Sequence, residues 1–301
     1  WPDDAGMRLS NLIRHPEFFS YLSKGNFEEA LTIPSPARDS LDIEIRVMPY
    51  SDDQYLLVAR DVTQIKQLDN LRKDFVANVS HELKTPLTVL QGYLEMVEDP
   101  AMTPPAMMTK AVGEMQRQSE RMRLLIDQLL ELSRMETPSH DVFERVVDAP
   151  SLLQQLQTEA EKLAKTKSIN VHFDVAPVKV YGKEDALRSA MQNLITNAIR
   201  YNQEGGDIRV TWQMVGSEVE FSVEDTGPGI ASEHLPRLTE RFYRVDKDRN
   251  SERGGTGLGL SIVKQALQHH NCELQVNSAL GKGSRFWFRL PAGLRVTGKR
   301  H

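Results

Sequence analysis

The chain has 301 residues, of which 40% are hydrophobic, and this is enough for a sizeable core and for about two or three domains. A formal net charge of −5 provides no positive field for nucleic acid, so we expect no nucleic-acid partner. The single cysteine, Cys272, excludes an internal disulfide and favours a reducing compartment. No apolar run is long enough to span a membrane, and a start at Trp1 without a signal peptide suggests a fragment.

Residues 1–61 predict a small mixed region that contains a β-hairpin. Ile43, Ile45 and Val47 alternate with charged residues, which is typical of a half-buried strand. A turn then leads into a second apolar strand at 55–59, and a helical patch precedes the pair. So few strands give a thin core for an independent domain.

Residues 62–137 predict two long helices joined as a hairpin. Apolar residues recur about every 3.5 positions, the period of a helical bundle. The first seam comprises Val62, Ile65, Leu68, Leu71, Phe75, Val79, Leu83, Leu87, Leu90, Leu94 and Val97, and the second comprises Met108, Ala111, Met115, Gln118, Met122, Leu125, Leu129 and Leu132. Asp99 and Pro100 would end the first helix, and Thr103 would cap the second. Two helices cannot cover such a stripe, so we predict a homodimeric four-helix bundle; alternatively, the hairpin packs on another domain.

His81 lies between the seam residues Val79 and Leu83, so it should point towards water. A neutral imidazole there is a nucleophile near neutral pH, and Glu82 could accept its proton. An exposed histidine on a helix is ordinary when taken alone. The zinc-protease pattern His-Glu-x-x-His fails, because Thr85 stands where the second ligand would be. A functional role for His81 therefore depends on a nucleotide site elsewhere.

Residues 138–293 alternate between helical and strand patterns, and residues 294–301 form a short tail. Strand pairs backed by helices favour an α/β sandwich with a largely antiparallel sheet. The expected helices lie near 152–163, 187–198 and 258–269, and the expected strands near 169–175, 208–212, 219–225, 272–277 and 285–290.

Two features of this region predict the walls of a nucleotide site. Asn193, Asn197 and Arg200 form a polar strip on an apolar helix, where amide oxygens suit Mg²⁺ and the guanidinium suits a phosphate. Asp225 ends an apolar strand face, and a buried acid there could bind an exocyclic amine such as that of adenine. Gly227 and Gly229 follow it and would permit close approach of a flat ring. The alternatives are a solvated helix face and an ordinary turn.

Two further segments predict phosphate contacts. The glycine-rich run 254–260 opens a helix, where free backbone N–H groups can bind phosphates. It lacks the lysine of a P-loop and the spacing of a dinucleotide fold, so both common nucleotide folds are disfavoured. The basic segment 237–253 is typical of a mobile lid over phosphates, or alternatively of a solvated loop.

Together these segments resemble the sensor histidine kinases of bacterial two-component systems, over about residues 62 to 290. His81 in Ser80-His-Glu-Leu-Lys-Thr-Pro86 resembles the phosphoacceptor box of that family. Segments similar to its ATP-site boxes follow in the expected order, at Asn193–Tyr201, Asp225–Ile230, Glu240–Arg244, Gly255–Leu260 and Gly281–Ser284. Arg200 stands where lysine is common, and Ser284 where threonine is common.

The resemblance implies an α+β multidomain protein with a dimeric helical hairpin and an ATP-binding domain of the Bergerat (GHKL) type. ATP and Mg²⁺ would be its cofactors, with Asn197 as a metal ligand. His81 would be the phosphoacceptor, Glu82 the general base and Thr85 the residue that positions water for dephosphorylating a partner, while Arg200 and Arg244 would neutralise charge. The implied ATP-binding residues are Asn193, Asn197, Tyr201, Asp225, Gly227, Gly229, Ile230, Phe242, Gly255, Thr256, Gly257, Leu258, Gly259 and Leu260.

Three segments further resemble the phosphate-regulon branch of the family: Glu44–Tyr50, Val58–Thr63 and Leu87–Leu94. That branch implies that residues 1–61 are the latter part of a PAS-like sensor domain and that the partner is the receiver domain of a response regulator. It also implies a cytoplasmic portion of an inner-membrane protein, attached through upstream segments. Two alternatives are an ATP-gated machine that hydrolyses ATP without a phosphoprotein, and a scaffold that has lost catalysis; the intact boxes argue against both.

Overall fold

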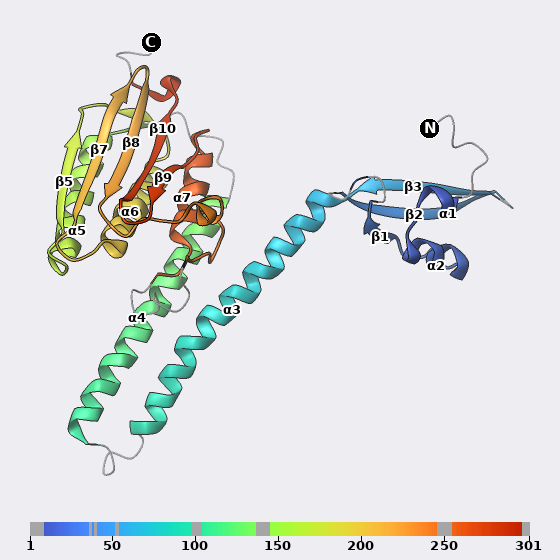
Figure 1. Ribbon diagram of the computed structural model, residues 1–301, viewed down its shortest axis with the longest axis horizontal. Coiled ribbons are helices and arrows are strands. Elements are labelled where there is room, and N and C mark those ends of the chain that lie inside the picture. The colour runs from blue at the N-terminus through green and yellow to red at the C-terminus, as the bar shows by residue number, and fades with distance from the viewer. Residues whose placement is uncertain are drawn as a thin grey trace. The chain divides into compact units, whose positions relative to one another are not determined.

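A computed structural model describes residues 9–35, 38, 41–51, 54–97, 104–136, 145–245 and 255–296. The chain divides into two compact units, residues 1–81 and 82–301. Each unit has its own packing (Figure 1).

The first unit contains a three-stranded antiparallel sheet in the order β1-β2-β3. Its elements are α1 (Leu9–Leu12), α2 (Pro16–Lys24), β1 (Leu31–Pro34), β2 (Asp42–Ser51) and β3 (Gln54–Asp61). The predicted hairpin is therefore present, and β1 is an additional strand that the sequence pattern did not indicate. A small core joins α2 to the sheet through Phe18, Ile33, Ile45 and Val47.

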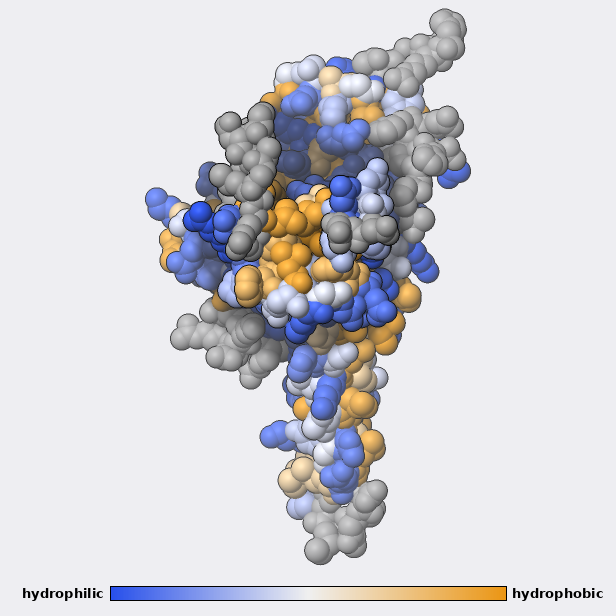
Figure 2. Space-filling model, turned by 90° about the vertical axis from the view of Figure 1, so that its right-hand side faces the viewer, coloured by the Kyte–Doolittle hydropathy of each residue, from blue (hydrophilic) through white to orange (hydrophobic). Residues whose placement is uncertain are grey.

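The two long helices are α3 (Thr63–Val97) and α4 (Pro105–Glu136). α3 continues through Pro86, whose side chain is buried. The predicted breaks at Asp99, Pro100 and Thr103 lie outside the described residues. Many seam side chains are exposed, and Figure 2 shows apolar side chains on the surface of the helical hairpin. The most exposed apolar residues of these helices are Ile65, Leu68, Leu71, Val76, Leu87, Leu94, Met107, Val112, Ile126 and Leu130.

The second unit contains a five-stranded sheet in the order β5-β7-β8-β10-β9. Its strands are β5 (Asn170–Val175), β7 (Asp207–Val215), β8 (Glu218–Asp225), β9 (Gln275–Ala279) and β10 (Gly283–Leu290). β5 and β7 are parallel and the other neighbours are antiparallel, so the prediction of a largely antiparallel sheet is confirmed. β9 differs in detail, because it begins at Gln275, whereas the sequence pattern predicts a start at Cys272.

Helices α5 (Ala149–Lys165), α6 (Glu184–Tyr201) and α7 (Gly259–Gln268) form one layer against the sheet (Figure 1). α5 begins where the side chain of Asp148 accepts a hydrogen bond from the N–H of Ser151, at 3.3 Å. α6 buries Leu187, Met191 and Leu194 on one stripe, so its polar strip is directed away from the core. The helices and the sheet share one core, and this packing fixes the positions in space of the ends of α6 and α7.

Four short elements complete the described part of the second unit, and the last of them crosses the expected boundary at residue 293. They are β4 (Val146–Val147), β6 (Val180–Tyr181), η2 (Ser232–Arg237) and η3 (Ala292–Leu294). Leu294 is buried, and the N–H of Val296 donates to the carbonyl oxygen of Lys179 at 3.0 Å. The predicted tail therefore contributes its first residues to the packed unit.

Candidate functional site

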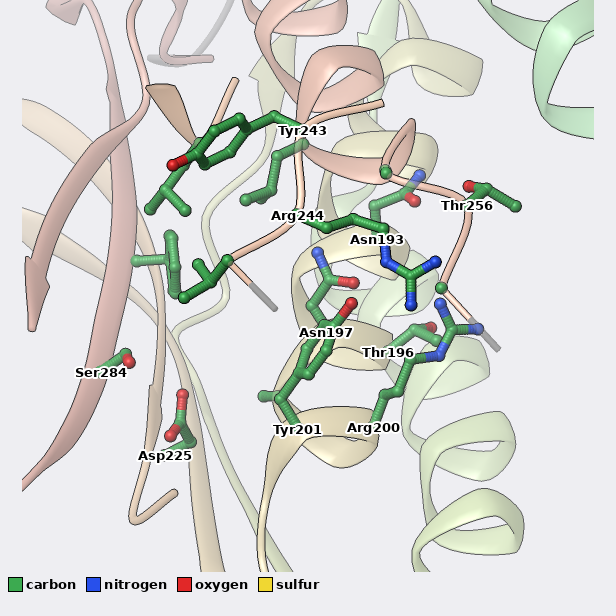
Figure 3. Close-up of a pocket in the computed structure, with 18 of the residues that line it drawn as sticks. Asn193, Thr196, Asn197, Arg200, Tyr201, Asp225, Tyr243, Arg244, Thr256 and Ser284 are labelled. Atoms are coloured by element: carbon green, nitrogen blue, oxygen red, sulfur yellow. The ribbon is translucent and has the colours of Figure 1, made fainter. Parts of the chain in front are cut away.

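A cavity of about 480 Å³ opens between α6, the end of β8, the segment after η2 and the glycine-rich loop before α7. α4 forms one further wall. The cavity is lined by Leu124, Asp127, Gln128, Glu131, Leu163, Gln192, Asn193, Thr196, Asn197, Ala198, Arg200, Tyr201, Asp225, Pro228, Gly229, Ile230, Leu238, Tyr243, Arg244, Val245, Gly255, Thr256, Gly257, Gly259, Leu260, Ser284 and Phe286. Figure 3 shows the polar residues converging on it from separate elements.

The polar strip of α6 faces this cavity. The side-chain NH₂ of Asn193 donates to the carbonyl oxygen of Ser189 at 3.0 Å, which fixes the orientation of the amide. A methyl group placed on Gly259 would lie 2.9 Å from Oδ1 of Asn193 and 3.7 Å from Oδ1 of Asn197. Both amide oxygens thus lie beside the N-terminus of α7. Amide oxygens there could bind a hard cation held between phosphates.

The end of α6 is stabilised by a lysine from another segment. Nζ of Lys167 donates to the carbonyl oxygens of Ile199, at 3.2 Å, and Arg200, at 2.5 Å. A cation at the C-terminus of a helix satisfies carbonyls that have no partner within the helix and interacts favourably with the helix dipole. This contact holds the last turn of α6, and with it Arg200 and Tyr201, against the body of the domain.

Asp225 ends β8 at the opposite side of the cavity from the two arginines Arg200 and Arg244 (Figure 3). Burial raises the pKa of its carboxyl group, and hydrogen bonds from the backbone of Gly227 and Ser284 oppose that effect. Gly227 N lies 2.8 Å from Oδ1. The preceding alternate residues of the strand, Val219, Phe221 and Val223, are almost fully buried, as the alternation in the sequence predicts. A carboxylate held at the edge of an apolar wall is suited to bind an amine on a flat ring.

The loop after Asp225 is fixed by contacts that require glycine. Gly229 has a φ of +71°, and a methyl group there would lie 2.0 Å from the carbonyl oxygen of Ala279. The next N–H, that of Ile230, donates to the hydroxyl of Ser278 at 2.8 Å. Ser278 also contacts the hydroxyl of Ser284 at 2.8 Å. This wall of the cavity is therefore bound to the β9–β10 hairpin.

Two guanidinium groups, those of Arg200 and Arg244, lie together at the other end of the cavity (Figure 3). Among the described residues, Nε and Nη2 of Arg244 are buried and have no hydrogen-bond partner. Buried donors normally have partners, so two such atoms beside a cavity indicate that an acceptor belongs there. Arginine binds phosphate oxygens in pairs, and the adjoining glycine-rich loop offers backbone N–H groups.

The segment Glu240–Arg244 places its residues differently from the sequence-based expectation. Phe242 was predicted to bind ATP, but it is not among the lining residues. It has a φ of +63°, and its N–H donates to the carbonyl oxygen of Gly257 at 2.9 Å. This left-handed turn directs Tyr243 and Arg244 to the cavity. The sequence contains no signal for a left-handed phenylalanine, so Tyr243 was missed.

α4 contacts the glycine-rich loop and α7 directly. The hydroxyl of Thr256 donates to the side-chain oxygen of Gln128. At the C-terminal end of α7, Nε2 of His269 lies 2.6 Å from the carbonyl oxygen of Met135. Arg241 forms an ion pair with Glu136. The residues of α4 that border the cavity were not predicted, because no local pattern reveals a contact across more than 100 residues.

The phosphoacceptor candidates lie on α3. His81 is exposed, as its position off the seam predicts, and Thr85 one turn later is exposed too. Glu82 is half-buried and pairs with Arg121 of α4, with Nη2 3.0 Å from Oε2. None of the three lines the cavity.

Residues 71–138 match the His Kinase A (phospho-acceptor) domain, and residues 182–294 match the histidine kinase-, DNA gyrase B- and HSP90-like ATPases. The chain belongs to the histidine kinase family. It is 43% identical over 286 residues to the phosphate regulon sensor protein PhoR of Pseudomonas aeruginosa, covering 95% of this chain and 65% of that protein. It is 40% identical over 250 residues to PhoR of Haemophilus influenzae, covering 83% of this chain and 58% of that protein. This histidine kinase chain therefore spans less than two thirds of either relative.

Among solved structures, the histidine kinase ThkA in complex with the response regulator protein TrrA matches 98% of this chain and 87% of that chain. The TM-score is 0.58 at 20% identity, which shows a common fold. The predicted helical hairpin and α/β sandwich of a histidine kinase are confirmed. The PAS-like assignment of residues 1–61 stays a prediction.

Most predicted ATP-site residues of this histidine kinase are brought together in one cavity. Gly227 and Leu258, like Phe242, support the lining residues without being among them. Leu258 is fully buried, and its N–H donates to the hydroxyl of Thr256 at 3.2 Å. In the described part of the chain, no three His, Cys, Asp or Glu side chains group as metal ligands. No described helix is both long and apolar enough to cross a membrane.

Proposed function

We propose that the chain is an ATP-dependent protein-histidine kinase that phosphorylates its own His81. The observation that carries this proposal is the polarity of the cavity: a half-buried carboxylate, Asp225, lies at one end, and the paired guanidinium groups of Arg200 and Arg244 lie at the other. An adenine amine would bind the first and phosphates the second. Two buried nitrogens of Arg244 have no hydrogen-bond partner among the described residues, which supports the binding of phosphate at that end.

In the proposed reaction, a ring nitrogen of His81 attacks the γ-phosphorus of ATP and forms a P–N bond. The bond from that phosphorus to the bridging oxygen breaks, and ADP leaves with the electron pair. The other ring nitrogen gives its proton to the carboxylate of Glu82. Phosphoryl transfer needs placement and charge neutralisation, which Arg200 and Arg244 would supply. Asn193 and Asn197 would hold Mg²⁺, which neutralises phosphate charge when bound.

We infer that the phosphoryl group then passes to an aspartate of a response-regulator receiver domain. The likeness to a kinase solved with a response regulator supports this class of partner. The identity to two phosphate regulon sensor proteins supports a partner of the phosphate-regulon type. Thr85 lies one turn after His81 and is exposed, which suits the positioning of water for dephosphorylating that partner.

We also propose that two copies pair through the helical hairpin. Leu87, Leu94 and Val112 are 58%, 54% and 41% exposed, and they line one apolar groove together with Leu90 and Met115. A second copy would cover this groove in a four-helix bundle. Replacing Leu94 by Glu should convert a dimer to a monomer in sedimentation experiments, and a natural chain that sediments as a monomer would contradict the pairing.

The remaining assignments concern the whole protein. We propose that residues 1–61 belong to a PAS-like sensor region and that the protein acts at the inner membrane, with the present chain on the cytoplasmic side. The similarity to phosphate regulon sensor proteins supports both.

The test of the kinase proposal is incubation with γ-labelled ATP. The chain should acquire acid-labile, base-stable phosphate, and His81→Gln should abolish the label while ATP binding persists. His172→Gln is a matched control, because His172 is exposed on β5 and lies in another element. Full labelling of the His81→Gln chain would refute the acceptor assignment. ATP hydrolysis without any phosphoprotein would identify an ATP-gated machine instead.

A further inference from the structure

Glu82 is connected to the second helix of the hairpin by a cross-helix ion pair. Nη2 of Arg121 in α4 lies 3.0 Å from Oε2 of Glu82 in α3, and the two side chains are 20% and 30% exposed. These residues are 39 positions apart in the chain. The pair therefore joins the residue that follows His81 to the middle of the opposite helix.

Neighbouring arginines of α4 behave differently. Arg117 pairs with Glu114, and Arg123 pairs with Glu120 and Asp127, all on α4 itself. The side chain of Arg123 is 64% exposed, and exposed pairs within a helix contribute little to stability. Arg121 reaches across the hairpin and is shielded from solvent, so its contact restricts the partner side chain more strongly than a surface pair does.

The restriction matters because a glutamate side chain has several rotatable bonds. An unrestrained Glu82 would sample many orientations, and only some of them direct an oxygen towards the adjacent imidazole. Arg121 binds one carboxylate oxygen, Oε2, and thereby limits the positions open to Oε1. Correct placement of a proton acceptor before the reaction lowers the entropic part of the barrier.

We propose that Arg121 is a positioning residue for the phosphorylation of His81, acting through Glu82. This inference rests on the proposed kinase function. Arg121 does not line the nucleotide cavity, so it should affect the rate of phosphoryl transfer and leave the binding of ATP unchanged.

The test is a double-mutant cycle on the full chain, in which initial rates of His81 labelling are measured over a range of ATP concentrations. Loss of the proton acceptor in Glu82→Gln should lower kcat about 100-fold. Arg121→Gln should lower kcat about tenfold, because the acceptor remains but is misplaced. Combining both changes should give the rate of Glu82→Gln within about twofold, because Arg121 then has nothing to position.

Arg123→Gln is the matched control, with the same change on the same helix at a pair that stays within α4. It should keep the natural kcat. Arg121→Lys should recover part of the rate, since a lysine keeps the charge but not the planar geometry. The KM for ATP should be the same in all these chains. The thermal midpoints of unfolding of Arg121→Gln and Arg123→Gln should also be equal.

Three results would overturn the positioning role: a natural kcat in Arg121→Gln, a further tenfold loss when it is added to Glu82→Gln, or a loss that appears in KM. If the natural chain takes up no label, the kinase proposal itself has failed. If the natural chain is labelled on His81 and Arg121→Gln is equally active, only the present inference has failed.

Discussion

Gly229 and Ala279 approach so closely that a methyl group on the glycine would lie 2.0 Å from the carbonyl oxygen of the alanine. The contact joins the loop after Asp225 to the end of β9, where the N–H of Gly281 also donates to the carbonyl oxygen of Pro228 at 2.7 Å. Two segments about 50 residues apart in the chain thus form one wall of the cavity through backbone contact.

This contact predicts that Gly229→Ala will disrupt the nucleotide site. The added methyl group must displace the β9 backbone, so we expect ATP binding to weaken by about 5- to 150-fold, which corresponds to a cost of about 1–3 kcal/mol for overpacking. Binding of a fluorescent ATP analogue measures the effect. Gly205→Ala is the matched control: Gly205 has a φ of +72° but has no atom within 4 Å of an added methyl group. Equal effects of the two changes would show that backbone strain alone, and not the contact, is responsible.

The position of Asp225 predicts a loss of nucleotide affinity in Asp225→Asn. The amide cannot provide a charged acceptor for the adenine amine, and a hydrogen bond to a charged group contributes about 1.5–3 kcal/mol, which corresponds to a 10- to 100-fold weaker Kd. Calorimetric titration with ATP measures it. Glu224→Gln, next in the chain and exposed on the other face of β8, should bind ATP normally. A natural Kd in Asp225→Asn would remove the proposed adenine contact.

The buried nitrogens of Arg244 predict that replacing this residue weakens binding only of ligands that carry phosphates. Arg244→Gln should weaken ATP binding by about 1.5–3 kcal/mol and leave adenosine binding unchanged, because only the phosphates would meet the guanidinium. Competition binding with adenosine and ATP measures the two separately. Arg209→Gln, an exposed arginine on β7, serves as the control for charge. If Arg244→Gln lost as much affinity for adenosine as for ATP, Arg244 would not act on the phosphates, and the prediction would be contradicted.

His270 predicts that the domain loses stability in mild acid. Its Nε2 accepts from the N–H of Lys183 at 3.1 Å, so Nδ1 carries the proton and donates to the carbonyl oxygen of Ala266 at 3.0 Å. Burial holds the pKa of His270 below its ordinary value of about 6.5. The unfolded chain therefore takes up a proton that the folded chain does not. The stabilising contribution is complete above about pH 6.5 and is lost as the pH falls towards the folded pKa.

Urea unfolding at pH 7 and pH 5 tests this expectation. At pH 7, His270→Gln should be less stable than the natural chain by about 1–3 kcal/mol, and the difference should narrow at pH 5. The exposed His172→Gln variant should keep the natural dependence on pH. If the difference in the free energy of unfolding between His270→Gln and the natural chain is the same at pH 7 and pH 5, the buried imidazole does not govern acid stability.

The sequence predicted well those features that depend on local periodicity. Apolar spacing identified the two long helices, and alternation identified the apolar face of β8 that ends at Asp225. The polar strip Asn193, Asn197 and Arg200 also follows from spacing on one helix, because side chains three or four residues apart share a face. These residues line the cavity as predicted.

The tertiary structure decided which residues meet across long separations. Because the backbone of Phe242 is left-handed, Tyr243 lines the cavity in place of Phe242. A positive φ at a bulky residue is sustained only by surrounding packing, here against Gly257. The contacts of Arg121 with Glu82 and of Gln128 with Thr256 likewise arise only when helices α3, α4 and the glycine-rich loop have packed. The sequence by itself determined the chemical groups and the faces on which they stand, because these depend on residues within a few positions. Their distances depend on the whole core, so only the folded chain could decide them.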